Sequence, residues 1–129
     1  MKLYLSPESR IKEIKKSFEQ YFPYLKLEFF SKKHDLRQGN PKKDIVFDTA
    51  TLIDVTGVMR EGEIEISFSE TVAELEQLFQ NKFNLPVQVF RKTKYSWIET
   101  TKTDNLTLGK QNRMGKDACG ARFDFPILL

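Results

Sequence analysis

The pattern of apolar and polar residues in the second half of the chain predicts an amphipathic helix over residues 70–84. Apolar residues recur every three or four positions, which is typical of a helix that buries one face. Thr71 followed by Glu74 is a capping-box pattern, and Pro86, which has no amide hydrogen, ends the helix. The apolar stripe consists of Val72, Leu75, Leu78, Phe79 and Phe83, and the polar side holds Glu74, Glu76, Gln77, Gln80 and Lys82.

Strand patterns lie on both sides of this helix. Residues 63–68 alternate strictly, with Ile64, Ile66 and Phe68 directed inward. After the helix, residues 87–90 and 95–101 are rich in β-branched and aromatic residues. The short basic segment 92–94 between them predicts a β-hairpin.

The first half of the chain has a similar order of elements. It predicts a strand at 2–5, a helix at 7–22 and a strand at 25–29. Ser6 is expected as the helix N-cap, with Pro7 in the first turn. Residues 31–44 are polar and predict a loop. The apolar segments 45–47 and 51–55 predict one or two further strands.

The two halves match each other in order, which favours an internal duplication. Four apolar helix positions, from Ile11 to Phe22, recur from Val72 to Phe83 at a constant offset of 61. An Asp-x-x-Thr-Leu element ends each half, at 48–52 and at 104–108. The alternative is two unrelated α+β segments, because amphipathic helices resemble one another by chance.

These elements predict one α+β domain over residues 1–129. We expect two strand–helix–strand repeats, about 2–57 and 63–112, followed by a tail at 113–129. They would form one mainly antiparallel sheet with both helices on one face, in a ferredoxin-like arrangement or a pseudo-twofold variant. The glycine-rich segment 109–115 is expected to be a loop.

The repeat and the two Asp-x-x-Thr-Leu elements resemble an uncharacterised family of small bacterial α+β proteins with duplicated halves. The resemblance covers residues 2–112 and leaves the tail outside. Its motifs are structural, so it implies no activity, cofactor or site residues for this chain.

Composition and charge exclude several classes of protein. The apolar runs are too short to span a bilayer and the first residues lack the apolar run of a signal peptide, so we expect a soluble cytoplasmic protein. The single cysteine excludes an internal disulfide. The net charge of +3 conceals an acidic middle, since residues 44–89 hold 9 acidic and 2 basic side chains. Such a distribution gives patches of opposite sign if the segments stay apart.

No group of residues predicts catalysis, a metal site or a cofactor. His34 and Cys119 would be the minimal nucleophilic pair, but no third residue supports them. Glu61, Glu63 and Glu65 would share one strand face, which favours a solvated surface over acid–base chemistry. We therefore expect a protein that is not an enzyme and carries no metal or cofactor.

The basic residues are the candidate binding residues. They fall in the loop after the second strand and around the predicted hairpin, where two aromatic residues accompany them. A binding or assembly module that joins a protein partner, or itself, is the preferred interpretation, with charged patches and an exposed sheet edge as the means. Nucleic-acid binding through the two basic loops is the alternative, because aromatic rings beside cations can stack bases and neutralise phosphates. The candidates are Lys32, Lys33, Arg37, Arg91, Lys92, Lys94, Tyr95 and Trp97.

Overall fold

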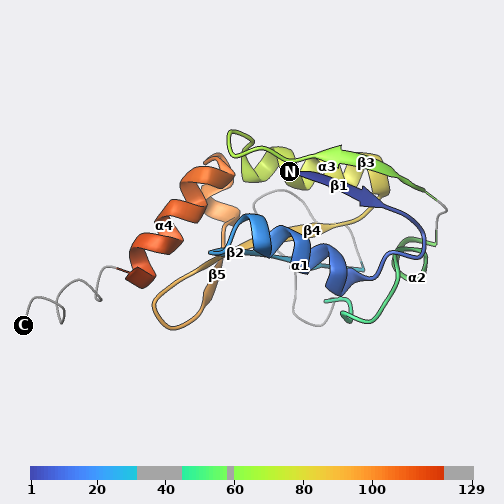
Figure 1. Ribbon diagram of the computed structural model, residues 1–129, viewed down its shortest axis with the longest axis horizontal. Helices are drawn as coiled ribbons and strands as arrows, with labels where there is room; N and C mark the ends of the chain where they lie inside the picture. The colour runs from blue at the N-terminus through green and yellow to red at the C-terminus, as the bar shows by residue number, and fades with distance from the viewer. Residues whose placement is uncertain (32–44, 58–59, 121–129) are drawn as a thin grey trace, which may run out of the picture.

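The computed structural model describes residues 1–31, 45–57 and 60–120, and these form an α+β structure with antiparallel sheets (Figure 1). The strands are β1 (Lys2–Leu5), β2 (Leu25–Phe29), β3 (Gly62–Glu65), β4 (Val87–Lys92) and β5 (Trp97–Glu99). The helices are α1 (Ile11–Tyr21), α2 (Leu52–Thr56), α3 (Val72–Phe83) and α4 (Leu108–Gly120), with a short 3₁₀ helix, η2 (Thr101–Thr103), before the last.

The strands form two sheets, and the expectation of a single sheet was wrong. β1 pairs with β3 in one antiparallel sheet, and β2, β4 and β5 form another with β4 in the centre. Each sheet contains strands from both halves of the chain: β1 with β3 in one, and β2 with β4 and β5 in the other. Both sheets bury one face in the same apolar core, and among the described residues no ladder joins one sheet to the other.

Phenylalanine rings dominate that core. Phe18 of α1 and Phe79 of α3 are fully buried, and Phe79 meets Phe29 of β2 edge to face at 6.0 Å between ring centroids. Phe22 and Phe83, near the ends of the two helices, are buried as well. The apolar stripes predicted for both helices are therefore confirmed except at Tyr21, which was expected in the first stripe and is 39% exposed, and Leu78 is partly buried at the margin.

The start of α3 follows the sequence signal. Thr71 Oγ1 accepts a hydrogen bond from the Glu74 amide at 3.1 Å, and Glu74 Oε1 accepts one from the Thr71 amide at 2.9 Å. Asn84 ends the helix in the left-handed conformation with φ 53°. The capping box is therefore confirmed.

The start of α1 differs from the prediction. Ser6 and Ser9 form a separate turn, in which the Ser6 amide donates to Ser9 Oγ at 2.9 Å, and the helix begins at Ile11. The Ile11 amide donates to the Ala50 carbonyl at 2.9 Å. The helix start is therefore held by a segment 39 residues away, and not by Ser6 and Pro7.

Four further element predictions were wrong or too long. Residues 51–55 form no strand, because Thr51 caps α2 by accepting from the Asp54 amide at 3.4 Å. Ile45 makes a single bridge to Phe30 in place of a strand at 45–47. β3 ends at Glu65, which leaves Phe68 outside the strand and 49% exposed, and β5 is shorter than 95–101.

The glycine-rich segment 109–115 belongs to helix α4 and is not a loop. The predicted hairpin between β4 and β5 is confirmed, with the Thr93 amide donating to the Ser96 carbonyl at 2.8 Å. Residues 113–120 of the expected tail are also in α4, and residues 121–129 lie outside the described residues.

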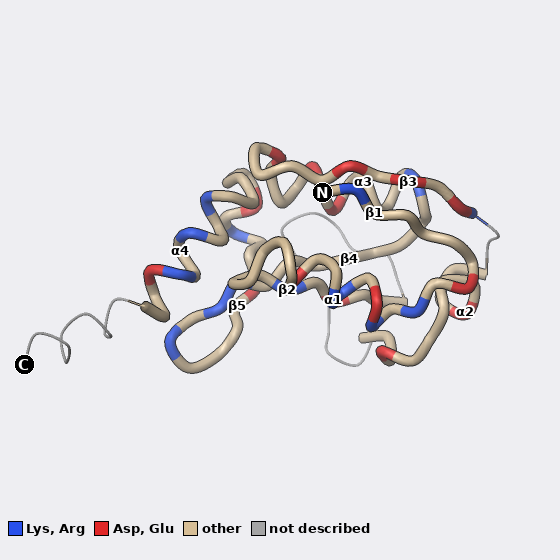
Figure 2. Tube along the Cα trace, in the orientation of Figure 1, with Lys and Arg blue, Asp and Glu red and all other residues tan. Residues whose placement is uncertain are grey.

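Charge is distributed unevenly over the described residues (Figure 2). Lys and Arg concentrate on α4 and on the β4–β5 hairpin, whereas Asp and Glu follow β3 and the segment before it. Glu63 and Glu65 are exposed on the outer face of β3, as the alternating pattern predicted.

Candidate binding surface

The residues predicted around the hairpin do not form one surface. In an antiparallel ladder alternate residues face opposite sides of the sheet. Arg91 therefore faces α4, where its guanidinium donates to Gln111 Oε1 at 2.7 Å and contacts Met114 Sδ at 3.6 Å. Lys92 and Trp97 lie opposite each other on the other face of the sheet.

Trp97 is half-buried, and cations lie over its ring. Lys26 Nζ lies 4.9 Å from the ring centroid and Lys92 Nζ lies 5.8 Å from it. Tyr95 is 87% exposed at the hairpin turn, with Lys94 Nζ 5.2 Å from its ring. A ring already covered by two ammonium groups offers little free face for stacking a base.

The first basic loop lies outside the described residues. Lys32, Lys33 and Arg37 belong to the segment 32–44, and His34 lies there too. The expectation that the two basic loops act together therefore stays a prediction.

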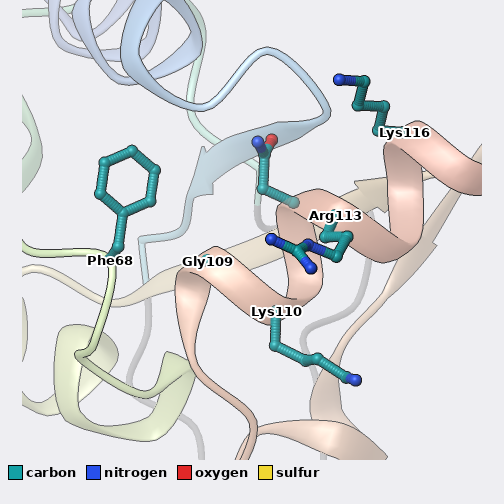
Figure 3. A pocket seen from close by; sticks show the side chains of 6 residues that line it. Phe68, Gly109, Lys110, Arg113 and Lys116 are labelled. Carbon is teal, nitrogen blue, oxygen red and sulfur yellow. The ribbon is translucent and has the colours of Figure 1, made fainter.

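A different basic surface is formed by α4, which sequence reasoning missed. Lys110, Arg113 and Lys116 leave successive turns of the helix and are exposed (Figure 3). Within the described ranges, the ion pairs of the structure connect Lys15 with Glu28 and Asp48, and Lys26 with Glu28, so these three α4 cations have no acidic partner there. Their charge is available to a ligand.

The three cations line a hollow of about 570 Å³, and Phe68 lies across from them on the segment after β3 (Figure 3). Its volume is within the range of roughly 300–1,000 Å³ found for ligand pockets. Gly109 and Asn112 complete the lining. We call Phe68, Lys110, Arg113 and Lys116 the α4 basic surface.

Phe68 is held in place although it is half exposed. Its ring lies 5.0 Å from both Tyr21 and Phe22, measured between centroids. Tyr21 is itself 39% exposed, so two neighbouring aromatic rings reach solvent, and Phe68 is the one that lines the hollow with the cations. Aromatic side chains and arginine are the residues that contribute most to protein–protein interfaces.

Polar contacts fix α4 against the rest of the molecule. Gln111 is fully buried and donates to the Thr103 carbonyl at 2.8 Å while it accepts from Arg91. Asn112 Oδ1 accepts from the Tyr24 amide at 2.9 Å. Near the other end, Cys119 Sγ donates to the Thr93 carbonyl at 3.3 Å. The α4 basic surface is therefore displayed on a supported helix.

A signal for α4 existed in the sequence but was overlooked. Lys110, Arg113 and Lys116 are spaced by three residues, which places them on neighbouring turns of a helix. Thr107 precedes the helix, and its hydroxyl accepts from the Lys110 amide at 3.1 Å. Gly109 and Gly115, which indicated a loop, instead allow close packing: a Cβ on Gly115 would lie 2.8 Å from Tyr24 Cβ.

One acidic residue of helix α3 is enclosed in the structure. Glu76, predicted on the polar side of α3, is instead buried, and its carboxylate accepts from the Val89 amide at 3.3 Å. Burial raises the pKa of Glu76 to about 8, and the nearby charges of Asp104 and Glu99 contribute. The Glu76 carboxyl is therefore enclosed and bound to the backbone of β4.

Cys119 is buried, and its thiol is bound to the hairpin backbone, which is the environment of a structural cysteine. In the described part of the chain, no group of three or more His, Cys, Asp or Glu residues is placed to hold a metal ion. The same residues contain no helix with the length and hydrophobicity needed to cross a membrane.

Comparison with protein families, with characterised proteins and with solved structures found no significant match to this chain. The resemblance to small bacterial α+β proteins with duplicated halves stays a prediction.

Proposed function

We propose that the protein is a non-catalytic binding module that holds an acidic segment of a protein partner on the α4 basic surface. One observation carries the proposal: three exposed cations with no acidic partner in the described residues line a hollow together with an exposed aromatic ring. An acidic segment with an apolar anchor would neutralise the cations and place its anchor against Phe68.

The experiment uses a fluorescent peptide with glutamates on both sides of a central phenylalanine. The variant Arg113→Glu/Lys116→Glu should weaken its binding by at least about tenfold, or roughly 1.4 kcal/mol. The matched control is Lys12→Glu/Lys16→Glu, which reverses two exposed lysines of α1. Equal losses in both variants would show that net charge, and not this surface, binds the peptide.

Nucleic-acid binding through the two basic loops is the second candidate. The observation that favours it is the set of cations beside Trp97 and Tyr95. The division of Arg91 and Lys92 between opposite faces of the sheet argues against it. A single-stranded oligonucleotide in the same assay separates the two: binding tighter than that of the peptide, lost in the Lys92→Ala/Lys94→Ala variant, would favour nucleic acid.

We also infer that the chain consists of two related halves in a pseudo-twofold arrangement. Equivalent positions of the halves lie opposite each other in both sheets, as a twofold axis requires. Leu3 pairs with Ile64 across β1 and β3, at an offset of 61. Glu28 pairs with Gln88 across β2 and β4, at an offset of 60.

Hydrogen bonds at the two helix starts support the same inference. Ile11 donates to Ala50 in the first half, and Val72 donates to Leu106 in the second. Each half then continues into a helix capped by a threonine, Thr51 for α2 and Thr107 for α4. Three further pairs of backbone bonds are equivalent in the two halves: Lys12 to Asp48 and Ala73 to Asp104, Leu52 to Ser9 and Leu108 to Glu70, and Ile53 to Pro7 and Gly109 to Phe68.

This arrangement accounts for the position of the binding surface. Phe68 occupies the place of Pro7, and the long helix α4 occupies the place of the five-residue helix α2. The aromatic ring and the three cations are therefore features of the second half alone. A longer helix in one half of a duplicated protein creates a single site and leaves the core that both halves share unchanged.

A further inference from the structure

Strand β5 forms an edge of the three-stranded sheet. It pairs with β4 on one side, and Ile98 and Glu99 are exposed, Ile98 to 41%. Natural proteins usually protect such an edge, because its backbone can pair with another strand. The shortness of β5 is one such protection, but the residue at its centre, Ile98, is exposed and uncharged.

The hydrogen-bond pattern of the hairpin shows which groups face the free edge. In antiparallel ladders, pairs that exchange hydrogen bonds alternate with pairs that do not. Thr93 bonds to Ser96, and Thr100 bonds to Val89, so the pair Arg91–Ile98 between them is a bonded pair. The backbone groups of Trp97 and Glu99 therefore point away from β4, towards solvent. The Trp97 carbonyl has a long contact of 3.5 Å with the Ser96 hydroxyl.

We propose that two copies of this chain join their β5 edges in an antiparallel pair centred on Ile98. This register places Trp97 of each copy opposite Glu99 of the other, so both outward-facing residues find backbone partners. The three-stranded sheet of one copy then continues into the three-stranded sheet of the other. Together they make one sheet of six strands, in the order β2-β4-β5-β5-β4-β2. The contact uses the same surface on both copies and closes as a dimer.

The charges around β5 suit this register. Glu99 is exposed and takes no part in the ion pairs found among the described residues. In the dimer it approaches Trp97 of the second copy, whose ring carries Lys26 and Lys92 at 4.9 and 5.8 Å. A carboxylate beside two ammonium groups is favourable, although Lys26 is already 3.6 Å from Glu28.

Apolar surface along the same edge would be covered as well. Ile98 meets Ile98 of the second copy at the centre. A hollow of about 620 Å³ beside it is lined by Phe90, Trp97 and the η2 segment. The dimer would also present two α4 basic surfaces, so a partner with two acidic segments would bind with higher avidity than a single segment.

Sedimentation velocity of the full chain, from micromolar to millimolar concentration, tests the proposal. We expect a monomer–dimer equilibrium in the wild type. The Ile98→Lys variant changes an exposed residue and puts two like charges opposite each other at the centre of the β5–β5 contact. This variant should therefore stay monomeric. A wild type that stays monomeric over the whole range would overturn the proposal.

Cross-linking tests the register independently. In a Cys119→Ser background, Ile98→Cys places two thiols at a non-bonded pair, where the Cα atoms are about 4.5 Å apart, which suits a disulfide. The Ile98→Cys variant should form a covalent dimer on mild oxidation. The control Tyr95→Cys is more exposed but would face Thr101 of the second copy, and should stay monomeric. Equal cross-linking of both variants would contradict this register.

Discussion

At the scale of single residues, Glu76 shows how a charged residue can serve as a backbone partner. Its carboxylate accepts from the Val89 amide where the β4–β5 ladder ends, and Thr100 Oγ1 donates to the Val89 carbonyl at 2.8 Å. The Thr100 amide also donates to the Val89 carbonyl, at 3.3 Å, so the Glu76 carboxylate supplies the one acceptor that this last pair of the ladder lacks. Burial is the main cause of the rise in the pKa of Glu76 to about 8, and Asp104 and Glu99 add to it.

The raised pKa makes stability depend on pH. Between about pH 4.5 and 8 the folded protein keeps the proton on Glu76 and the unfolded chain releases it. Stability therefore falls as pH rises through this window, by up to roughly 1.4 kcal/mol per pH unit. The neutral Glu76→Gln variant keeps an acceptor for Val89 and should be more stable than wild type at pH 8 but equal at pH 4.

Urea unfolding at several pH values measures this effect. The control is Glu65→Gln, which makes the same change on the exposed face of β3. We expect the slope of stability against pH to flatten in Glu76→Gln and to stay unchanged in the control. A slope that survives the Glu76 substitution would assign the pH dependence to another group.

At the scale of elements, interactions between residues close in the sequence could be predicted, and interactions between distant segments could not. The cap of α3 involves Thr71 and Glu74, three residues apart, so the sequence contains the whole interaction. The start of α1 depends on Ala50, and no local pattern encodes that contact. Helix α4 packs through the polar Gln111 and the small Gly115 as well as Leu108 and Cys119, so its apolar residues alone show no helical period.

The candidate site follows the same division. The exposure of Lys92, Lys94 and Tyr95 was predictable from the turn between two strands. The inward position of Arg91 could not be predicted in this way, because it depends on a hydrogen bond to Gln111, which lies 20 residues later in helix α4. The α4 basic surface consists of residues of helix α4 and of Phe68, which lies outside strand β3. The strand pattern predicted neither the helix nor this position of Phe68.

Close packing at Gly115 yields a prediction for α4. The Gly115→Ala substitution would bring its Cβ to 2.8 Å from Tyr24 Cβ and 3.1 Å from the Tyr24 carbonyl oxygen. Alanine favours a helix by up to about 1 kcal/mol over glycine, but overpacking costs about 1–3 kcal/mol. We therefore expect a net loss of stability, measured by thermal unfolding.

Gly120 provides the matched control in the same helix. A Cβ on Gly120 would meet nothing within 4 Å, so Gly120→Ala should be neutral or slightly stabilising. If Gly115→Ala were as stable as Gly120→Ala, α4 would have to be free to move away from Tyr24. The α4 basic surface would then lack the support that the structure gives it.

At the scale of the whole molecule, the two halves share their sheets and their core. β1 pairs with β3 and β2 pairs with β4, so neither half completes a sheet alone. Phe29 of the first half packs on Phe79 of the second. We therefore expect the described residues to unfold as one cooperative unit, since damage to either half removes partners from the other.

Equivalent core positions test this expectation. Phe18 and Phe79 are both fully buried, one in each half, and Phe18→Ala or Phe79→Ala should each cost about 3–5 kcal/mol. Phe47 is 83% exposed, so Phe47→Ala should change stability by less than about 0.5 kcal/mol. Because β2 and β4 share a ladder, either core variant should speed hydrogen exchange in both strands equally. Exchange that accelerates only in β2 for Phe18→Ala, and only in β4 for Phe79→Ala, would mean that the halves are independent folding units.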